Sequence, residues 1–200
     1  MSRYLGPKCR LCRREGKKLF LKGERCNSPK CPLEKKGAVP PGVHRTKSYV
    51  SKQSEFGKQL REKQKVKRIY GVSERQMKKY FKEARKEKAA TGKALLRLLE
   101  SRLDNVIYRL GFASSRAEAR QLIKHGFFQV EGRKVDIPSF LVKKGDVISL
   151  TKKTQIEKAF EPPSWLERKG GAARVINLPK DDQLPSDIDD YLIVEFYSRV

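Results

Sequence analysis

An excess of positive charge is the feature that most constrains this chain. It holds 47 lysines and arginines against 23 aspartates and glutamates in 200 residues, a formal net charge of +24. Charge of one sign repels itself in a compact fold until a polyanion neutralises it. Nucleic acid is the expected polyanion, because each neutralised phosphate releases condensed counterions. The composition therefore predicts a protein that binds nucleic acid.

An anionic membrane surface is the alternative partner, and the sequence disfavours it. No run approaches the roughly 18 apolar residues of a membrane-spanning helix. The opening residues contain no apolar signal region. We therefore expect no membrane binding, and a cytoplasmic protein or an organellar one already processed.

The positive charge is concentrated in the first half of the chain. Residues 1–90 carry 28 basic and 8 acidic side chains, whereas residues 91–180 carry 18 and 9. Residues 181–200 carry one basic and six acidic side chains. The first half is therefore the main predicted contact with nucleic acid, and the acidic end is expected to pack on the protein or to meet a basic neighbour.

The four cysteines follow the pattern C-x2-C-x13-C-x4-C, at Cys9, Cys12, Cys26 and Cys31. Two close pairs separated by a loop are typical of a thiolate metal site with no open coordination position. Zn²⁺ is the first expectation, and a four-iron iron–sulfur cluster is the alternative. Disulfides or four unliganded thiols are the other possibilities, and disulfides suit a cytosolic chain poorly. We predict a four-cysteine, metal-binding basic segment over residues 1–45, whose folding energy the metal would supply.

Two basic helices are predicted over residues 46–90. Ser54 can cap a helix that ends before Gly71, and Ser73 with Gln76 forms a capping box for the next one. The second helix carries an apolar stripe at i, i+3, i+4 and i+7 and a basic stripe beside it. We expect the basic stripe to contact RNA.

A compact α/β module is predicted over residues 91–155. Leucines and a valine repeat at helical spacing over residues 95–110, and a second helix begins at the capping box Ser115–Glu118 and ends at Gly126. Residues 127–135 have the pattern of a tight hairpin, and residues 141–150 add strand signals around a turn. The module is therefore two helices followed by a small, mostly antiparallel sheet. One of Phe127 and Phe128 is expected to fill its core.

The last predicted region covers residues 156–200. A break at Pro162-Pro163 is followed by residues 192–197, whose apolar run is typical of a strand. The expected fold class is thus α+β.

No catalytic motif accompanies these elements. His44 and His125 lie in no nucleophile motif, and the paired aspartates occur only in the acidic end. We predict a protein that is not an enzyme and has no small-molecule substrate.

At residues 101–150, the sequence SRLDNVIYRLGFASSRAEARQLIKHGFFQVEGRKVDIPSFLVKKGDVISL resembles the RNA-binding module named after small-subunit ribosomal protein S4. The stretches RYLGPKCRLCRREG, LKGERC, LREKQKVKRIYGVSERQMKKYF and VEFYSR resemble the ribosomal protein S4 family itself, in its cysteine-containing metal-binding branch. The likeness extends over essentially the whole chain, in order.

This resemblance implies a helical domain into which the RNA-binding module is inserted, so that the C-terminal segment returns to the first domain. It also implies a structural constituent of the small ribosomal subunit that binds 16S-type rRNA directly, nucleates assembly of the subunit body and contributes to translational accuracy. The implied place is the cytoplasmic ribosome near the mRNA entry channel, with ribosomal proteins S5 and S3 and mRNA as neighbours.

The predicted RNA contacts are basic side chains or histidines from every region except the acidic end. Such a surface contacts the RNA backbone and recognises the shape of the RNA, with few contacts to base edges. The predicted set is Arg3, Arg10, Arg13, Arg14, His44, Arg45, Lys47, Arg61, Lys65, Arg68, Lys78, Lys82, Arg116, Arg120, Lys124, His125, Arg133 and Lys134.

Two other classes of protein carry the same module. An RNA-modifying enzyme or synthetase would need a separate catalytic domain of more than about 100 residues. A stress-type module that rescues stalled large subunits would need neither the cysteines nor the helix at residues 60–70.

Overall fold

The computed structural model describes residues 4–42, 54–87, 90–151 and 161–199. The chain divides into two compact units, one of residues 1–82 and 186–200 and the other of residues 83–185. The first unit contains α1 (Lys8–Glu15), the 3-10 helix Gly23–Cys26, α2 (Pro32–Lys36), α3 (Glu55–Ile69), most of α4 (Glu74–Ala84) and α8 (Asp190–Arg199). The second contains α5 (Thr91–Glu100), α6 (Leu103–Arg109), α7 (Arg116–Lys124), β1 (Phe128–Val130), β2 (Arg133–Lys134), β3 (Val147–Leu150), β4 (Leu166–Lys169), β5 (Ala172–Val175) and the 3-10 helix Asp181–Gln183.

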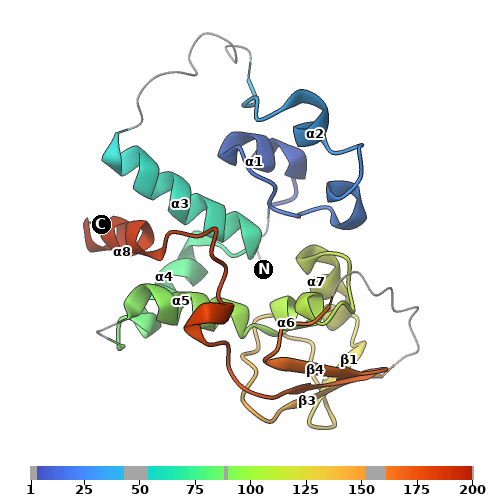
Figure 1. The fold of residues 1–200 in the computed structure, drawn as a ribbon. Helices are drawn as coiled ribbons and strands as arrows, with labels where there is room; N and C mark the ends of the chain where they lie inside the picture. The colour runs from blue at the N-terminus through green and yellow to red at the C-terminus, as the bar shows by residue number, and fades with distance from the viewer. Residues whose placement is uncertain (1–3, 43–53, 88–89, 152–160, 200) are drawn as a thin grey trace. The chain divides into compact units, whose positions relative to one another are not determined.

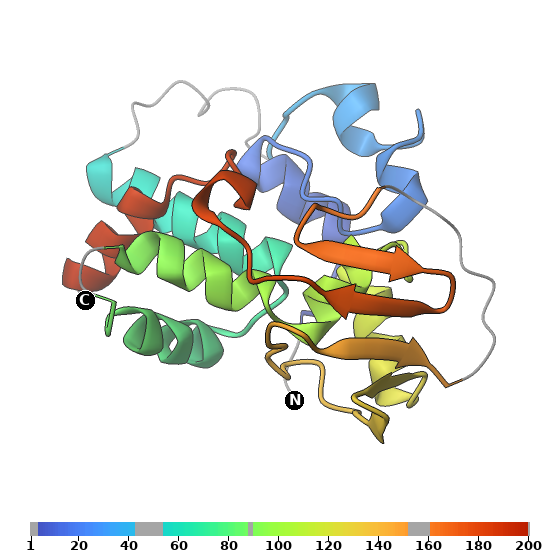
Figure 2. The same ribbon diagram turned by 60° about the horizontal axis from the view of Figure 1, so that its bottom comes forward.

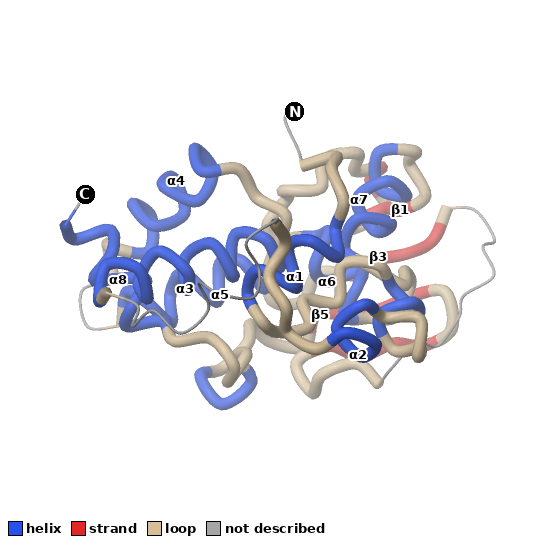
Figure 3. Tube along the Cα trace, turned by 90° about the horizontal axis from the view of Figure 1, so that it is seen from above, coloured by secondary structure: helices blue, strands red, loops and turns tan. Residues whose placement is uncertain are grey.

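The predicted α+β class is confirmed. All the described strands belong to the second unit, and the C-terminal helix belongs to the first, although 103 residues of the second unit intervene between its parts. The unit that contains the sheet is therefore inserted in the chain between the two parts of a helical unit (Figure 3). In the described part of the chain, no helix has both the length and the apolar character needed to cross a bilayer.

The first unit is held together by helix α8 lying against helix α3 (Figure 1). The ring of Phe196 stacks on Phe56 at 5.7 Å between centroids, and Tyr197 stacks on Phe81 at 4.6 Å. Lys65 Nζ donates to the Asp187 carbonyl at 2.6 Å. Aromatic contacts of this kind add to the burial energy of the rings.

Residues 192–197 are helical, so the predicted final strand is wrong. Asp189 Oδ1 accepts the Leu192 amide at 3.3 Å and so caps the first turn. A helix brings Ile193, Phe196 and Tyr197 onto one face at i, i+3 and i+4, where the first two are buried. A short apolar run does not distinguish a strand from a helix, and packing on α3 decides it here.

The predicted caps of α3 and α4 are confirmed. Ser54 Oγ accepts the Gly57 amide at 3.2 Å at the start of α3. Ser73 and Gln76 exchange two bonds of 3.3 Å, each side chain accepting from the other's amide. These bonds satisfy helix-end donors locally, which explains why the sequence was sufficient to predict them.

The single helix predicted over residues 95–110 is two helices, α5 and α6. The Leu103 amide donates to Phe140 O at 2.8 Å and the Asp104 amide to Pro138 O at 3.1 Å, so neither continues the ladder of α5. Arg102 also forms an isolated bridge with Leu141. The chain at residues 138–141 therefore takes the hydrogen bonds that would have joined the two helices.

The sheet of the second unit has the order β2-β1-β3-β5-β4, and every neighbouring pair is antiparallel (Figure 2). The predicted hairpin is confirmed as β1 and β2, with Glu131 and Gly132 at φ 50° and 72° in the two-residue turn. Phe128 is fully buried and Phe127 only partly, as expected.

Strands β4 and β5 were not predicted, because residues 156–200 were assigned to the C-terminal segment. Their sequence LERKGGAARV is charged and glycine-rich, with little β propensity. They are in the sheet because β5 pairs with β3, Ile148 opposite Ala173, and because Trp165 and Val175 are buried in the core. Tertiary pairing outweighs local preference here.

Glu74 links three side chains of the first unit, which generates a prediction. Although partial burial opposes ionisation, hydrogen bonds from Lys63 and Lys67 at 3.0 Å and from Tyr197 at 2.9 Å lower the pKa of Glu74. Glu74→Gln should lower the free energy of local unfolding by about 1 kcal/mol at neutral pH, a figure reduced for solvent screening.

A carboxyl group whose pKa is lowered by folding stabilises the fold at pH values above its unfolded-state pKa. This stabilisation is lost as the pH falls through the folded-state pKa of the group. The two proteins should therefore converge below about pH 4. Amide exchange of α3 and α8 measures the difference. Glu83→Gln, which removes an exposed i,i+3 partner of Lys86, is the control. A pH-independent difference would contradict the role given to the carboxylate.

Candidate nucleic-acid interface

Most of the cations of α3 are neutralised within the protein. Arg61 lies 3.4 Å from Glu15, and Arg68 is paired with the same carboxylate. Lys65 is buried and pairs with Glu62 at 2.5 Å. The predicted contacts Arg61, Lys65 and Arg68 are therefore engaged in the fold, and Lys65 is a correction to the surface role expected of it, since its ammonium is enclosed.

Helix α4 presents the opposite situation. Its apolar stripe is buried at Met77 and Phe81, while four basic side chains on the remaining face are exposed. No ion pair is formed by any of the four with another described residue. Lys78 and Lys82 were predicted as contacts, whereas the other two were missed although the helical pattern places them on the same solvent face. The four are Arg75, Lys78, Lys79 and Lys82.

In the second unit, Asp104 neutralises two arginines in the interior. Arg102 donates through Nε and Nη2 at 3.0 and 2.8 Å, and Arg120 donates to Oδ2 through Nε and Nη2 at 3.0 and 2.5 Å. Arg102 and Asp104 are 1% exposed and Arg120 is 8% exposed. Arg120 was predicted to lie on a surface edge. Its burial corrects that expectation, because the guanidinium pairs with a carboxylate at the start of α6.

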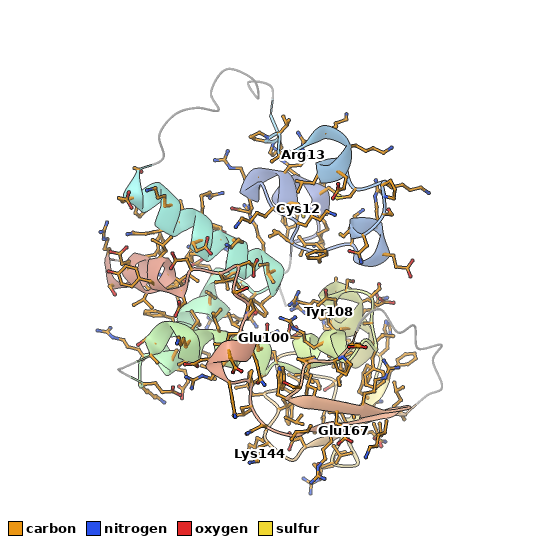
Figure 4. All side chains as sticks on the ribbon, in the orientation of Figure 1. Cys12, Arg13, Glu100, Tyr108, Lys144 and Glu167 are labelled. Carbon is orange, nitrogen blue, oxygen red and sulfur yellow. The ribbon has the colours of Figure 1, made fainter. Side chains whose placement is uncertain are left out.

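Arg116 belongs to a second network on the same helices. Its Nε donates to Asn105 Oδ1 at 2.7 Å, and its guanidinium lies 4.5 Å from the centre of the Tyr108 ring. Asn105 Nδ2 donates to Glu100 Oε2 at 2.8 Å, and Glu100 also accepts two bonds from Arg109. Figure 4 labels Tyr108 of α6 and Glu100 at the end of α5. Arg116 is half-buried, so its planar group is oriented by the protein and only part of it faces solvent.

The exposed cations of this unit lie where α7 runs into the hairpin. Lys124, His125, Arg133 and Lys134 are all exposed, as predicted for a contact surface. The Lys134 side chain passes directly over Gly126, where a Cβ atom would lie 2.2 Å from Lys134 Cε. Gly126 has φ +71°, so a side chain there would be strained as well. The glycine therefore allows the lysine to join the other three cations.

The predicted contacts of the N-terminal segment also include both exposed side chains and one that is bonded within the fold. Arg10 and Arg14 are exposed, while Arg13 is half-buried and donates to Val39 O and Pro40 O at 2.8 and 3.0 Å. Arg3, His44, Arg45 and Lys47 lie outside the residues that the structure describes.

The cysteines form the interior of the segment that contains α1 and α2. Cys12, Cys26 and Cys31 are buried together with Leu19, and Cys9 is half-buried. The Lys22 amide donates to Cys26 Sγ at 3.3 Å. Burial raises the pKa of the Cys12 thiol; a hydrogen bond from the Leu19 backbone opposes this, and Cys26, Cys9 and Cys31 raise the pKa further. Thiols are thus most of the core of this segment.

Thiol sulfurs that accept amide hydrogens suit a thiolate metal site chemically. The arrangement of the four thiols in the structure does not match such a site. Among the described residues, which include all four cysteines, no group of three or more potential ligand side chains is arranged to hold a metal ion. Metal binding stays a prediction.

The features above define a basic helical protein that carries an inserted RNA-binding module of the S4 type. A family model described as the ribosomal protein S4/S9 N-terminal domain matches residues 3–100, and one described as the S4 domain matches residues 101–148. The chain belongs to the family of small ribosomal subunit protein uS4.

Relatives of that name cover the whole of this chain and are themselves covered fully. The protein from Natranaerobius thermophilus is 50% identical over 211 residues, and that from Thermoanaerobacter sp. is 51% identical over 209. A relative from Symbiobacterium thermophilum, named small ribosomal subunit protein uS4A, is 50% identical over 210 residues.

The buried Asp104 cluster generates a second prediction. Asp104→Asn would remove the carboxylate that pairs with the buried guanidinium groups of Arg102 and Arg120. Breaking a buried ion pair by removing one partner typically costs about 3–5 kcal/mol. Urea unfolding followed by fluorescence of Trp165, the single tryptophan and a buried residue of the same unit, measures the loss.

Asp136→Asn is the matched control, because Asp136 is exposed and such substitutions change stability by less than about 0.5 kcal/mol. Equal stability of the two variants would show that the buried pairs are not required by the fold.

Proposed function

We propose that this protein is a structural constituent of the small ribosomal subunit that binds its rRNA mainly through the phosphate backbone. The observation that carries the proposal is the separation of the cations into two sets. One set is neutralised by internal carboxylates, and the other is exposed without an acidic partner among the described residues, on α4 and at the end of α7. Membership of the uS4 family supports the same conclusion.

The proposal includes no catalytic activity and no small-molecule substrate. The buried carboxylates Glu100 and Asp104 accept hydrogen bonds from arginine or asparagine side chains, so neither is available as a general base. The exposed cations suit the binding of a polyanion.

The finer parts of the function are proposals as well. We infer early binding that nucleates assembly of the subunit body, a contribution to translational accuracy, and a place near the mRNA entry channel beside ribosomal proteins S5 and S3. These parts depend on the family resemblance. The acidic surface at Asp187 and Asp189 offers a complement to a basic neighbour.

The rRNA contact is tested by charge reversal at the end of α7. Lys124→Glu combined with Lys134→Glu should weaken binding to the five-prime part of small-subunit rRNA by about tenfold or more and reduce the salt slope by about 2. Fluorescence anisotropy between about 50 and 200 mM salt measures both quantities.

Lys143→Glu combined with Lys144→Glu is the matched control, with two exposed lysines of the same unit. Figure 4 shows Lys144 at the other end of this unit from Tyr108. Equal losses in the two double variants, or a flat salt dependence of the unmodified protein, would contradict a localised phosphate contact.

We also propose that the four cysteines bind Zn²⁺, with a four-iron cluster as the alternative cofactor. Support comes from the donor set, the burial of three thiols and the hydrogen bond that the Lys22 amide donates to Cys26 Sγ. Bound zinc would cross-link α1 to the two later cysteines and stabilise a segment whose core is otherwise Leu19 and little else.

Elemental analysis of the purified protein should find about one zinc per chain, and Cys26→Ser should reduce it. Ser28→Ala, a change between the last two cysteines that removes no thiol, is the control. Iron with acid-labile sulfide would indicate the cluster instead. Metal-free protein that keeps full amide-exchange protection of α1 would refute the metal site.

A further inference from the structure

Helix α8 supplies part of the interior on which α3 packs. Ile193 and Phe196 of α8 are 0% and 6% exposed, and Ile188 just before the helix is buried as well. Figure 1 shows α8 lying along α3, although the two helices come from opposite halves of the sequence. The interior beside α3 therefore includes residues from the end of the chain.

The face that α3 turns inward is mostly polar. Its buried residues are Gln59, Lys63, Lys65 and Val66, so only one of the four is apolar. Burying an amide or an ammonium group costs free energy unless a partner accepts its hydrogen bonds or balances its charge. Packing on a purely apolar surface would therefore stabilise α3 little, and the helix needs matched partners on the element that covers it.

Two of these partners are acceptors in the C-terminal segment. Gln59 Nε2 donates to Glu195 Oε2 at 2.7 Å. Lys65 Nζ donates to the Asp187 carbonyl at 2.6 Å. The two bonds join residues that are 136 and 122 positions apart in the chain. Neither bond can form until the C-terminal segment is present.

Two further contacts fix the same segment on α3. The ammonium group of Lys63 lies 4.3 Å from the centre of the Phe196 ring. In the opposite direction, the Asp189 amide donates to Glu62 Oε1 at 2.8 Å. The polar face of α3 and residues 187–197 are thus matched to each other group by group.

The second unit differs because it is one continuous segment, residues 83–185. Its cluster of buried apolar residues extends from Leu103 to Val175 and includes no residue of the first unit. All five strands of its sheet belong to the same segment. This core is therefore complete in the chain before residues 186–200 are added.

We propose that α8 is a closing helix: the second unit folds first and independently, and the packing of α3 and α4 becomes stable only when residues 186–200 are available. Domains fold as units during synthesis. Since the closing residues are the last to be synthesised, this part of the first unit folds only on the completed chain. The exposed cations of α7 and the hairpin are then in place before those of α4. The inference concerns folding, goes beyond the proposed function and does not depend on RNA.

A point variant of the full chain tests the dependence of α3 on α8. Phe196→Ala removes the ring that stacks on Phe56 and lies beside Lys63. Truncating a buried aromatic residue should speed amide exchange in α3 and α8 about 100-fold or more, and should leave exchange in β1, β3 and β5 unchanged within about twofold. Hydrogen-exchange mass spectrometry measures both quantities.

Tyr191→Ala is the matched control, since Tyr191 is another aromatic residue of α8 and is 67% exposed. It should leave exchange in both units close to that of the unmodified protein. Equal acceleration of α3 and the sheet by Phe196→Ala would show that the two units unfold together, and unchanged exchange in α3 would show that α8 does not stabilise it. Either result would overturn the proposal.

The order of folding is tested by refolding the full chain from urea with pulse-labelled amide exchange. The amides of β1, β3 and β5 should become protected in an earlier phase, and those of α3 and α8 together in a later one. Protection of α3 in a phase that precedes α8, or of the sheet only together with α8, would overturn the proposed order. Because neither experiment contains RNA, failure of the proposed rRNA contact would leave both results unaffected.

Discussion

One carboxylate that neutralises two cations is the interaction on which the described structure depends. Glu74 pairs with Lys63 and Lys67, and Tyr197 bonds to the same carboxylate, which ties α3 and α4 to α8. Asp104 joins the start of α6 to α7 through Arg102 and Arg120. Glu15 holds two arginines of α3 against α1. With twice as many basic as acidic residues, the chain must share its carboxylates in this way to form an interior.

The cations left outside these clusters are the proposed contacts with rRNA. Those on α4 and at the junction of α7 and the hairpin are exposed, and their helices are fixed by the internal pairs described above. A removed internal pair would therefore weaken RNA binding indirectly, by loosening the element that carries the exposed charges. Charge reversal of an exposed lysine would act on the contact itself, so stability and affinity measurements separate the two groups of residues.

In the strongly basic N-terminal segment, buried thiols form the interior in place of aliphatic side chains. Its interior is three thiols and one leucine, and its basic residues are adjacent in sequence to those thiols. The thiols of this segment therefore bring α1, the 3-10 helix Gly23–Cys26 and the start of α2 together, and they are the same groups that we propose as metal ligands.

The sequence by itself determined the features that depend on neighbours in the chain: the charge, the caps at Ser54 and Ser73, the hairpin turn at Glu131-Gly132 and the cysteine spacing. Periodicity could not separate α5 from α6, because the bonds that interrupt them come from residues 138–141. Nor could it assign residues 192–197 to a helix or β4 and β5 to the sheet, since those states depend on packing against distant elements. Tertiary structure alone decided that Arg120 and Lys65 are buried while Lys78 and Lys124 are exposed, because a basic side chain becomes internal only where the fold brings an acceptor or carboxylate to it.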